Sequence, residues 1–297
     1  LQPNNCEALG GLGLVAGVQG RWIDALAYFR TVQRLDSGYF QMVDQIPGML
    51  EAGRRYSEAV EERRRSVSPQ RNELPRSFSL ALLSFRARGS TLEVEEFLAK
   101  VSAVDADSDT GIRIRKRWAI LIGNREELDR LDKLKPNLNA ATLVPYLSSG
   151  QLVSAVVLAT KGDLAGARAR LETVPAQLRQ RLAGEPANDR VWATLGMVEA
   201  LLGHSPEALR CAQKAVELVP ESNDARNGPR IGASRAFVYA WTGDNDRAIA
   251  EYARLLRVPY SGLNIYEMKH DPWYAPLRGD PRFEALLNDS KNNAPLF

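Results

Sequence analysis

Residues 191–222 read VWATLGMVEALLGHSPEALRCAQKAVELVPES, and this stretch decides the fold. Apolar residues recur at helical spacing on both sides of Gly203, which predicts two amphipathic helices joined at that glycine. Gly203 can adopt a positive φ and end the first helix. Pro206 suits the first turn of the second helix, where its missing N–H is not needed. The stretch therefore predicts an antiparallel helical hairpin.

A glycine at the end of an apolar helical stretch recurs along the whole chain. Seven glycines each end an apolar stretch of helical spacing, and by subtraction they are 33, 36, 34, 39, 41 and 40 residues apart. These glycines are Gly20, Gly53, Gly89, Gly123, Gly162, Gly203 and Gly243. Because no hairpin can bury its apolar face alone, a run of hairpins at this period predicts a stacked solenoid.

The quoted stretch resembles the tetratricopeptide repeat (TPR) family, and residues 8–36 and 232–256 resemble it as well. The matching residues of the quoted stretch are Trp192, Leu195, Gly196, Gly203, Ala208, Ala212, Ala215 and Pro220. The unit ending at Gly123 departs most, because Arg115 and Lys116 stand where the family has Leu and Gly. The resemblance implies an all-α, right-handed superhelical solenoid of antiparallel helix pairs. We expect about seven units over residues 1–265 and a capping segment over 266–297.

Residues 10–17 offer a competing interpretation, because GLGLVA from Gly11 to Ala16 is spelled like a dinucleotide-binding turn. Such a turn must follow a strand and open a helix, and residues 1–9, LQPNNCEAL, have no strand character. The repeat frame instead places Gly13 where paired helices cross. Gly10, Gly11 and Gly17 do not follow from that frame, so they indicate either close approach of a partner or a weak helix near the start of the chain.

The closing residues 270–287, HDPWYAPLRGDPRFEALL, resemble the end of many bacterial multidomain proteins. In those proteins such repeats follow a kinase, a nucleotide cyclase or a winged-helix DNA-binding domain. Asp280 is suited to cap a helix that begins at Pro281, and Phe283 and Leu287 would then pack on the last hairpin. The opening LQPNN looks like the end of a repeat, so we expect further sequence upstream.

Composition narrows the classes of function. The formal net charge of +3 is too small to indicate nucleic-acid binding, and no apolar run is long enough to span a membrane. Cys6 and Cys211 are too few for a disulfide scaffold or a cysteine zinc site. We expect a cytoplasmic protein, with the periplasmic side of a membrane-anchored regulator as the alternative.

Sequence motifs of catalysis are missing from the chain. It contains no H-E-x-x-H, P-loop or G-x-S-x-G pattern, and its two histidines are too few for a histidine metal site. His204 is expected in an exposed turn between helices, and His270 in a capping or packing role. We therefore expect no catalytic residue, no cofactor and no metal.

What remains is a surface for another protein. In the TPR family the first helix of each pair lines a concave groove that binds peptides, and the equivalent positions here carry recurrent arginines. Carried over, the groove residues are Arg76, Ser79, Leu83, Arg113, Arg117, Leu152, Val156, Arg190, Met197, Arg230, Phe237 and Trp241. Guanidinium groups favour a protein or peptide partner of acidic character, although these arginines could equally just solvate that face.

Two functions remain open from the sequence. The first is a protein-interaction scaffold that holds a partner segment in the groove. The alternative is a sensory or regulatory arm of a larger signalling protein whose effector domain lies upstream of residue 1. The family's known clamp for carboxylate-ended peptides uses Lys and Asn at set positions that this chain lacks.

Overall fold

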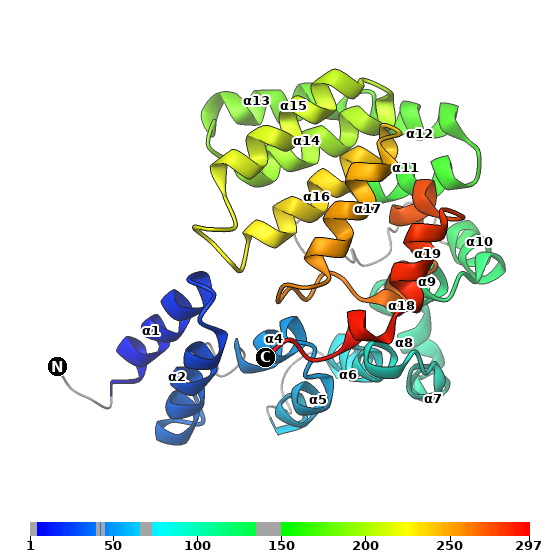
Figure 1. The fold of residues 1–297 in the computed structure, drawn as a ribbon. Helices are drawn as coiled ribbons and strands as arrows, with labels where there is room; N and C mark the ends of the chain where they lie inside the picture. Colours follow the sequence, from blue (N-terminus) through cyan, green and yellow to red (C-terminus); the bar gives the residue numbers. More distant parts are fainter. Residues whose placement is uncertain (1–4, 40–41, 43–44, 66–72, 135–149) are drawn as a thin grey trace.

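The computed structural model describes residues 5–39, 42, 45–65, 73–134 and 150–297, and within these ranges every regular element is a helix (Figure 1). Consecutive helices pack as antiparallel pairs, each joined by a short turn. The first four pairs are α1 (Cys6–Val18) with α2 (Trp22–Leu35), α4 (Gln45–Ala52) with α5 (Tyr56–Arg65), α6 (Glu73–Arg88) with α7 (Leu92–Lys100), and α9 (Asp109–Leu121) with α10 (Arg125–Leu134). The all-α solenoid of helix pairs is thus confirmed.

Three further pairs complete the stack: α11 (Gly150–Thr160) with α12 (Leu164–Leu171), α14 (Asp189–Leu202) with α15 (Ser205–Leu218), and α16 (Gly228–Trp241) with α17 (Asn245–Leu255). Two additional helices, α8 (Ala103–Asp107) and α13 (Val174–Gly184), lie between pairs. The insertion of α13 explains why the separation between Gly162 and Gly203, 41 residues, is the longest of the six.

The turn glycines behave as the sequence predicts. Six of the seven have φ between 69° and 88°, the left-handed region that glycine enters without steric penalty. Gly53 is the exception, because Arg54 beside it takes φ of 58° in its place. The period read from glycines therefore marks the real helix turns.

Small residues allow the paired helices to approach closely. A Cβ added at Gly196 in α14 would lie 3.0 Å from the carbonyl oxygen of Ala208 and 3.1 Å from the backbone nitrogen of Ala212, both in α15. A Cβ added at Gly13 in α1 would lie 2.8 Å from the ring of Phe29 in α2. Both glycines thus occupy helix-crossing positions, as expected.

The fourth pair is held together differently. Where the family has apolar and small residues, Arg115 of α9 pairs with Glu127 of α10 at 2.8 Å, and Lys116 pairs with Asp132 at 2.8 Å. The side chain of Lys116 is only 2% exposed. Ion pairs along the seam replace the missing small residues, so the degenerate sequence still forms a helix pair.

The glycine-rich stretch lies inside α1, which begins at Cys6 with Asn5 as its N-cap. It cannot be a turn after a strand, so the dinucleotide-binding interpretation of GLGLVA is wrong. A Cβ at Gly17 would lie 2.8 Å from Met49 Cε and 3.1 Å from Arg226 Cδ. The protein's own side chains therefore cover this part of α1.

The last forty or so residues, 256–297, are called the C-terminal segment below. They contain α18 (Ile265–Met268), the 3₁₀ helices η1 (Pro272–Leu277) and η2 (Ser290–Asn293), and α19 (Pro281–Asn288). The Asp280 side chain accepts from the Arg282 N–H at the start of α19, and Phe283 and Leu287 are buried against α17, as expected. The boundary expected between residues 265 and 266 falls inside α18.

The C-terminal segment crosses the inner side of the stack, between the later pairs and the earlier ones (Figure 1). At its end, the Leu296 N–H donates to the Gly53 carbonyl at 3.0 Å, and the Phe297 ring stacks on Trp22 at 6.2 Å. The loop before α16 also reaches α1, where the Ala225 N–H donates to the Val18 carbonyl at 2.8 Å. The stack therefore curls until its first and last pairs share neighbours.

Candidate binding site

A cavity of about 600 Å³ lies where the early pairs, the loop before α16 and the C-terminal segment meet. Its size suits a small ligand or a single large side chain. We call it the arginine cavity, because guanidinium groups from five places in the chain line it. They belong to Arg63 in α5, Arg86 in α6, Arg117 in α9, Arg226 before α16, and Arg230 in α16.

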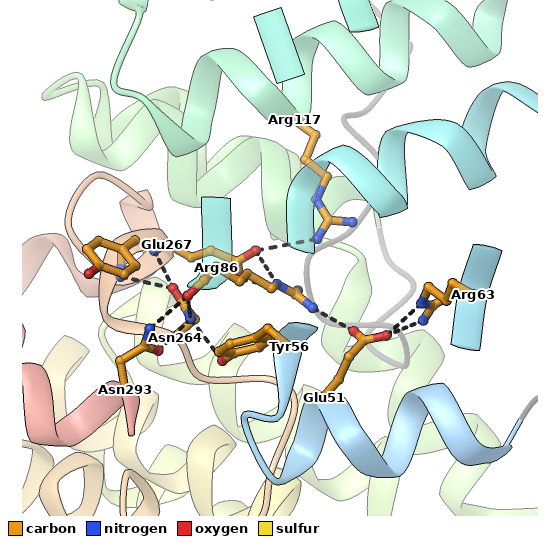
Figure 2. Close-up of polar contacts among 9 residues, drawn as sticks. Glu51, Tyr56, Arg63, Arg86, Arg117, Asn264, Glu267 and Asn293 are labelled. Carbon is orange, nitrogen blue, oxygen red and sulfur yellow. Dashed lines mark hydrogen bonds and ion pairs between the residues drawn. The ribbon is translucent and has the colours of Figure 1, made fainter. Parts of the chain in front are cut away.

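Arg86 lies between two carboxylates (Figure 2). Its Nη1 is 3.0 Å from Glu51 Oε2 of α4, and its Nε is 2.8 Å from Glu267 Oε1 of α18. All three side chains are about nine-tenths buried. Burial acts to lower the pKa of Arg86, but the two carboxylates raise it above its ordinary value, so this guanidinium is firmly charged.

The ion pairs continue on both sides of Arg86. Arg63 Nε donates to Glu51 Oε1 at 2.8 Å, and Arg117 Nη2 lies 4.0 Å from Glu267 Oε1 (Figure 2). Three arginines therefore share two carboxylates. Since each carboxylate already accepts from Arg86, the outer two guanidinium groups are only partly neutralised.

Arg117 has the least satisfied guanidinium of this group. Its side chain is 17% exposed, and its Nε is buried with no hydrogen-bond partner among the described residues. Burial lowers the pKa of Arg117 to about 10, opposed by Glu267 and reinforced by the neighbouring charge of Arg86. A guanidinium group at a cavity wall whose ion pair is as long as 4.0 Å is a strong donor for an anion.

The other wall is formed by the start of α16. Arg226 Nη2 donates to Gln45 Oε1 at 2.9 Å, and no described carboxylate forms an ion pair with it. Arg230 is 5% exposed and lies 3.7 Å from Asp189 Oδ2. Ser79, Asn227 and Ser261 add hydroxyl and amide groups to the lining.

Two asparagines of the C-terminal segment hold the site closed. The Asn264 side-chain amide lies 3.0 Å from Tyr56 Oη and 2.9 Å from the Arg86 carbonyl, and the Asn293 amide donates to the same carbonyl at 2.8 Å (Figure 2). That carbonyl belongs to the last turn of α6. Carbonyl groups in the last turn of a helix have no hydrogen-bond partner within the helix itself. The segment thus caps α6 and fixes the backbone that carries Arg86.

The twelve residues that were expected to line one groove lie in three different environments in the structure. Three of them line the arginine cavity: Ser79, Arg117 and Arg230. Five are corrected from surface to core, because each is at most 1% exposed: Leu83, Leu152, Val156, Met197 and Phe237. The curl of the stack packs these first-helix positions against neighbouring pairs, where an open groove would have exposed them.

The remaining four lie away from the cavity. Arg113 and Arg190 are exposed, and Arg76 Nη2 is 3.5 Å from the Arg63 carbonyl. Trp241 Nε1 donates to the Trp273 carbonyl of the C-terminal segment at 3.1 Å. Arg113 and Arg117 are one turn apart on α9, yet only Arg117 faces the cavity.

Sequence reasoning missed several residues of this site. Arg63 belongs to the run of three arginines at residues 63–65, a pattern that on its own indicates a solvated helix face, and Arg226 lies in a loop without periodicity. Glu51 and Glu267 do not belong to any sequence motif that would have marked them as part of a site. The only available signal was the excess of arginine at inner positions, which pointed to the correct chemistry but not to these residues.

The expectation of an exposed His204 is confirmed. His204 is 63% exposed at the start of α15, with its Nδ1 2.7 Å from Glu199 Oε2, and Cys211 is fully buried. Across the residues that the structure describes, no group of three or more His, Cys, Asp or Glu side chains could hold a metal ion. No helix in the same residues is long and apolar enough to cross a membrane.

Comparison with known proteins adds little. No family model matches the chain, and no curated protein matches it either. Among solved structures, the TPR domain of P58(IPK) is similar at 15% identity, covering 98% of this chain and 80% of that one, with a TM-score of 0.22. A score this low means that the two whole backbones do not superpose, so the description of the fold rests on the helix pairs themselves.

Proposed function

We propose that the chain is a protein-interaction scaffold of the TPR kind, and that the arginine cavity is where it takes hold of an acidic partner. The observation that carries this proposal is the convergence of Arg63, Arg117 and Arg226 from α5, α9 and the loop before α16. Arginines gathered at a cavity wall favour acidic groups, because guanidinium binds carboxylate or phosphate bidentately.

The mode of docking differs from a long open groove. The C-terminal segment occupies the inner side of the stack, so we place the acidic side chain or chain end of a partner in the arginine cavity. Contact with the exposed rim would supply the rest of the interface. Affinity is expected to depend on a few arginines in the cavity.

A paired substitution tests the proposal. Arg117→Glu with Arg226→Glu reverses two cavity charges, whereas Arg113→Glu with Arg190→Glu reverses two exposed charges on the same protein. Partners captured from the source organism are quantified by mass spectrometry and then bound as purified proteins. We expect at least one acidic partner to bind wild type and the control, but at least tenfold more weakly to the cavity variant. Equal binding to both variants would remove the cavity from the proposal.

A second candidate is a regulatory arm of a larger signalling protein. The observation that favours it is the interlocking of the C-terminal segment with early helices through Glu267, Asn264 and Phe297. A ligand in the cavity would touch both halves at once and so shift any equilibrium between them. The sequence encoded upstream of residue 1 tests this idea: a kinase, cyclase or winged-helix domain there supports it, and repeats alone oppose it.

A further inference from the structure

We infer that the arginine cavity binds a phosphoryl group in its doubly charged form. The inference rests on the proposed function in placing an acidic ligand in this cavity, and it names the chemistry of that ligand. The residues that line the cavity carry a net positive charge.

The count of charges is taken over the described residues of the cavity and its ion pairs. Four guanidinium groups, those of Arg63, Arg86, Arg117 and Arg226, face two carboxylates, those of Glu51 and Glu267. The difference, four minus two, leaves two positive charges. Arg230 is left out of this sum, because Asp189 lies 3.7 Å from it. Asp271, the other carboxyl that acts on Arg117, is left out because burial raises its pKa to about 7. A dianion would therefore neutralise the cavity, whereas a single carboxylate would leave one charge over.

The donors also suit a tetrahedral anion better than a planar one. Arg117 reaches the cavity from α9, while Arg63 and Arg226 approach from two other elements. Donors that come from different directions match the several oxygens of a phosphoryl group. Ser261 adds a hydroxyl group to the lining. The Ser79 hydroxyl already donates to the Pro75 carbonyl at 2.8 Å, and the Asn227 amide already donates to Asp224 Oδ2 at 2.6 Å.

The low dielectric of the site strengthens these contacts. Arg86 is 12% exposed and Arg117 is 17% exposed, so an anion between them is screened far less than one at the surface. Arg86 is paired with Glu51, which also lines the cavity, and with Glu267, so its role is to neutralise those carboxylates. The arginines that contact the ligand directly are then Arg63, Arg117 and Arg226.

Two sources could supply the group, namely a free phosphorylated small molecule and a phosphorylated side chain of the partner. A cavity of about 600 Å³ admits either one. The experiment separates them by using inorganic phosphate, a phosphoserine peptide, the same peptide with Glu in place of phosphoserine, and the peptide with unmodified Ser.

Binding is measured by isothermal titration calorimetry on the whole 297-residue chain at constant ionic strength. We expect inorganic phosphate to bind saturably with one site per chain and at least tenfold more tightly than acetate. Affinity should rise between pH 5.5 and pH 7.5, because a phosphate group gains its second charge near pH 6. Binding with no such rise, or no tighter than acetate, would overturn the inference.

The variants assign the site. Arg117→Gln and Arg226→Gln should each weaken phosphate binding at least tenfold, while Arg113→Gln, one turn away on α9 and exposed, should not change it. Thermal melting of each variant identifies any that fails to fold, and having two independent cavity variants keeps the test valid if one does. Equal affinity for all three variants would place the phosphate elsewhere and refute the assignment.

The peptides decide the source and separate the two proposals. Tighter binding of the phosphoserine peptide than of inorganic phosphate identifies a phosphorylated partner, and the reverse order identifies a small molecule. If phosphate and the phosphopeptide fail while the Glu peptide binds and depends on Arg117, the phosphoryl inference is wrong and the proposed function stands. If no peptide binds but phosphate does, the phosphoryl site stands and the scaffold proposal loses its docking point.

Discussion

The pair α14–α15 and the contact between the C-terminal segment and α6 are both buried, but they are built from opposite kinds of residue. In the pair, Gly196 lets the backbone of α14 approach that of α15 to van der Waals distance. In the other contact, Arg86 bridges Glu51 and Glu267, and Asn264 caps the end of α6. Local helix pairing thus uses shape, and the long-range closure uses charge.

The difference has a consequence for function. A seam of small residues is self-sufficient, because it leaves no polar group in need of a partner. Closure by charge also brings Arg63, Arg117 and Arg226 to a cavity wall beside Arg86, where we propose that they bind a ligand. The site is a by-product of the way in which the stack is closed.

The largest effect is expected at the charged closure. Arg86→Leu leaves Glu51 and Glu267 buried with fewer cations, and losing one partner of a buried ion pair costs about 3–5 kcal/mol. The free energy of unfolding, measured by urea denaturation, should fall by that amount. Arg254→Leu is the matched control, because Arg254 also bridges two glutamates but is 45% exposed. It should lose less than about 1 kcal/mol. Equal losses in the two variants would mean that burial does not strengthen the closure.

The seam of small residues comes next. Gly196→Ala places a methyl group 3.0 Å from a backbone oxygen of α15, so we expect a loss of about 2 kcal/mol from overpacking. Gly11→Ala in α1 adds the same methyl group where no atom lies within 4 Å. There the better helix propensity of alanine should stabilise the protein by about 0.5–1 kcal/mol. Melting curves of both variants show whether each substitution raises or lowers the stability. A change in the same direction for both would contradict the crossing geometry.

The third prediction concerns Asp271, at the start of η1 in the C-terminal segment. Burial raises the pKa of this carboxyl to about 7, with Glu267 adding to the rise and with Arg278 and Arg117 opposing it. A raised pKa means that the folded state holds the proton more tightly than the unfolded chain does. The contribution to stability is therefore complete below about pH 4, the unfolded pKa, and is lost as the pH rises toward 7.

Asp271→Asn tests that sign. The amide can still accept the Trp273 N–H bond that Asp271 accepts at 2.9 Å, but it does not titrate. Relative to wild type, the variant should gain more than about 1 kcal/mol in unfolding free energy between pH 4 and pH 7.5. Urea denaturation at both pH values measures the difference, and a constant difference would show that Asp271 titrates normally.

The smallest effect is expected in the polar seam of the fourth pair. Arg115 and Glu127 are each about a quarter exposed, and Glu127 also accepts from Arg130 at 2.7 Å. Arg115→Met should therefore change the unfolding free energy by less than about 1 kcal/mol, because Glu127 keeps a partner and water. A loss as large as that of Arg86→Leu would show that charge dominates within the helix pairs as well.

Much of the fold could be predicted from the sequence, since helix pairs are local. Gly20, Gly203 and Gly243 mark turns because a positive φ is needed where each first helix ends, and that need recurs with the repeat. The curl of the stack is not local. It depends on contacts such as Arg86 with Glu267, which are 181 residues apart, and no period in the sequence reports them.

The sequence predicted that arginines would form the candidate site, but it did not predict which arginines or where in the fold they would meet. Arg117 and Arg113 look equivalent in the sequence RIRKR, and only the packing of α9 turns one into the cavity and the other to solvent. Phe237 and Met197 were expected at the surface because the family frame supposes an open groove. Here the chain's own C-terminal segment fills that side, so apolar groove positions became core.

The most direct measurement of the charged closure is a double-mutant cycle between Arg86→Gln and Glu267→Gln. The two side chains lie 2.8 Å apart, and one belongs to the stack while the other belongs to the C-terminal segment. Unfolding free energies of wild type, both single variants and the double variant should give a coupling of about 1–3 kcal/mol. Losses that add to within about 0.5 kcal/mol would contradict the contact, and with it the closed stack that forms the arginine cavity.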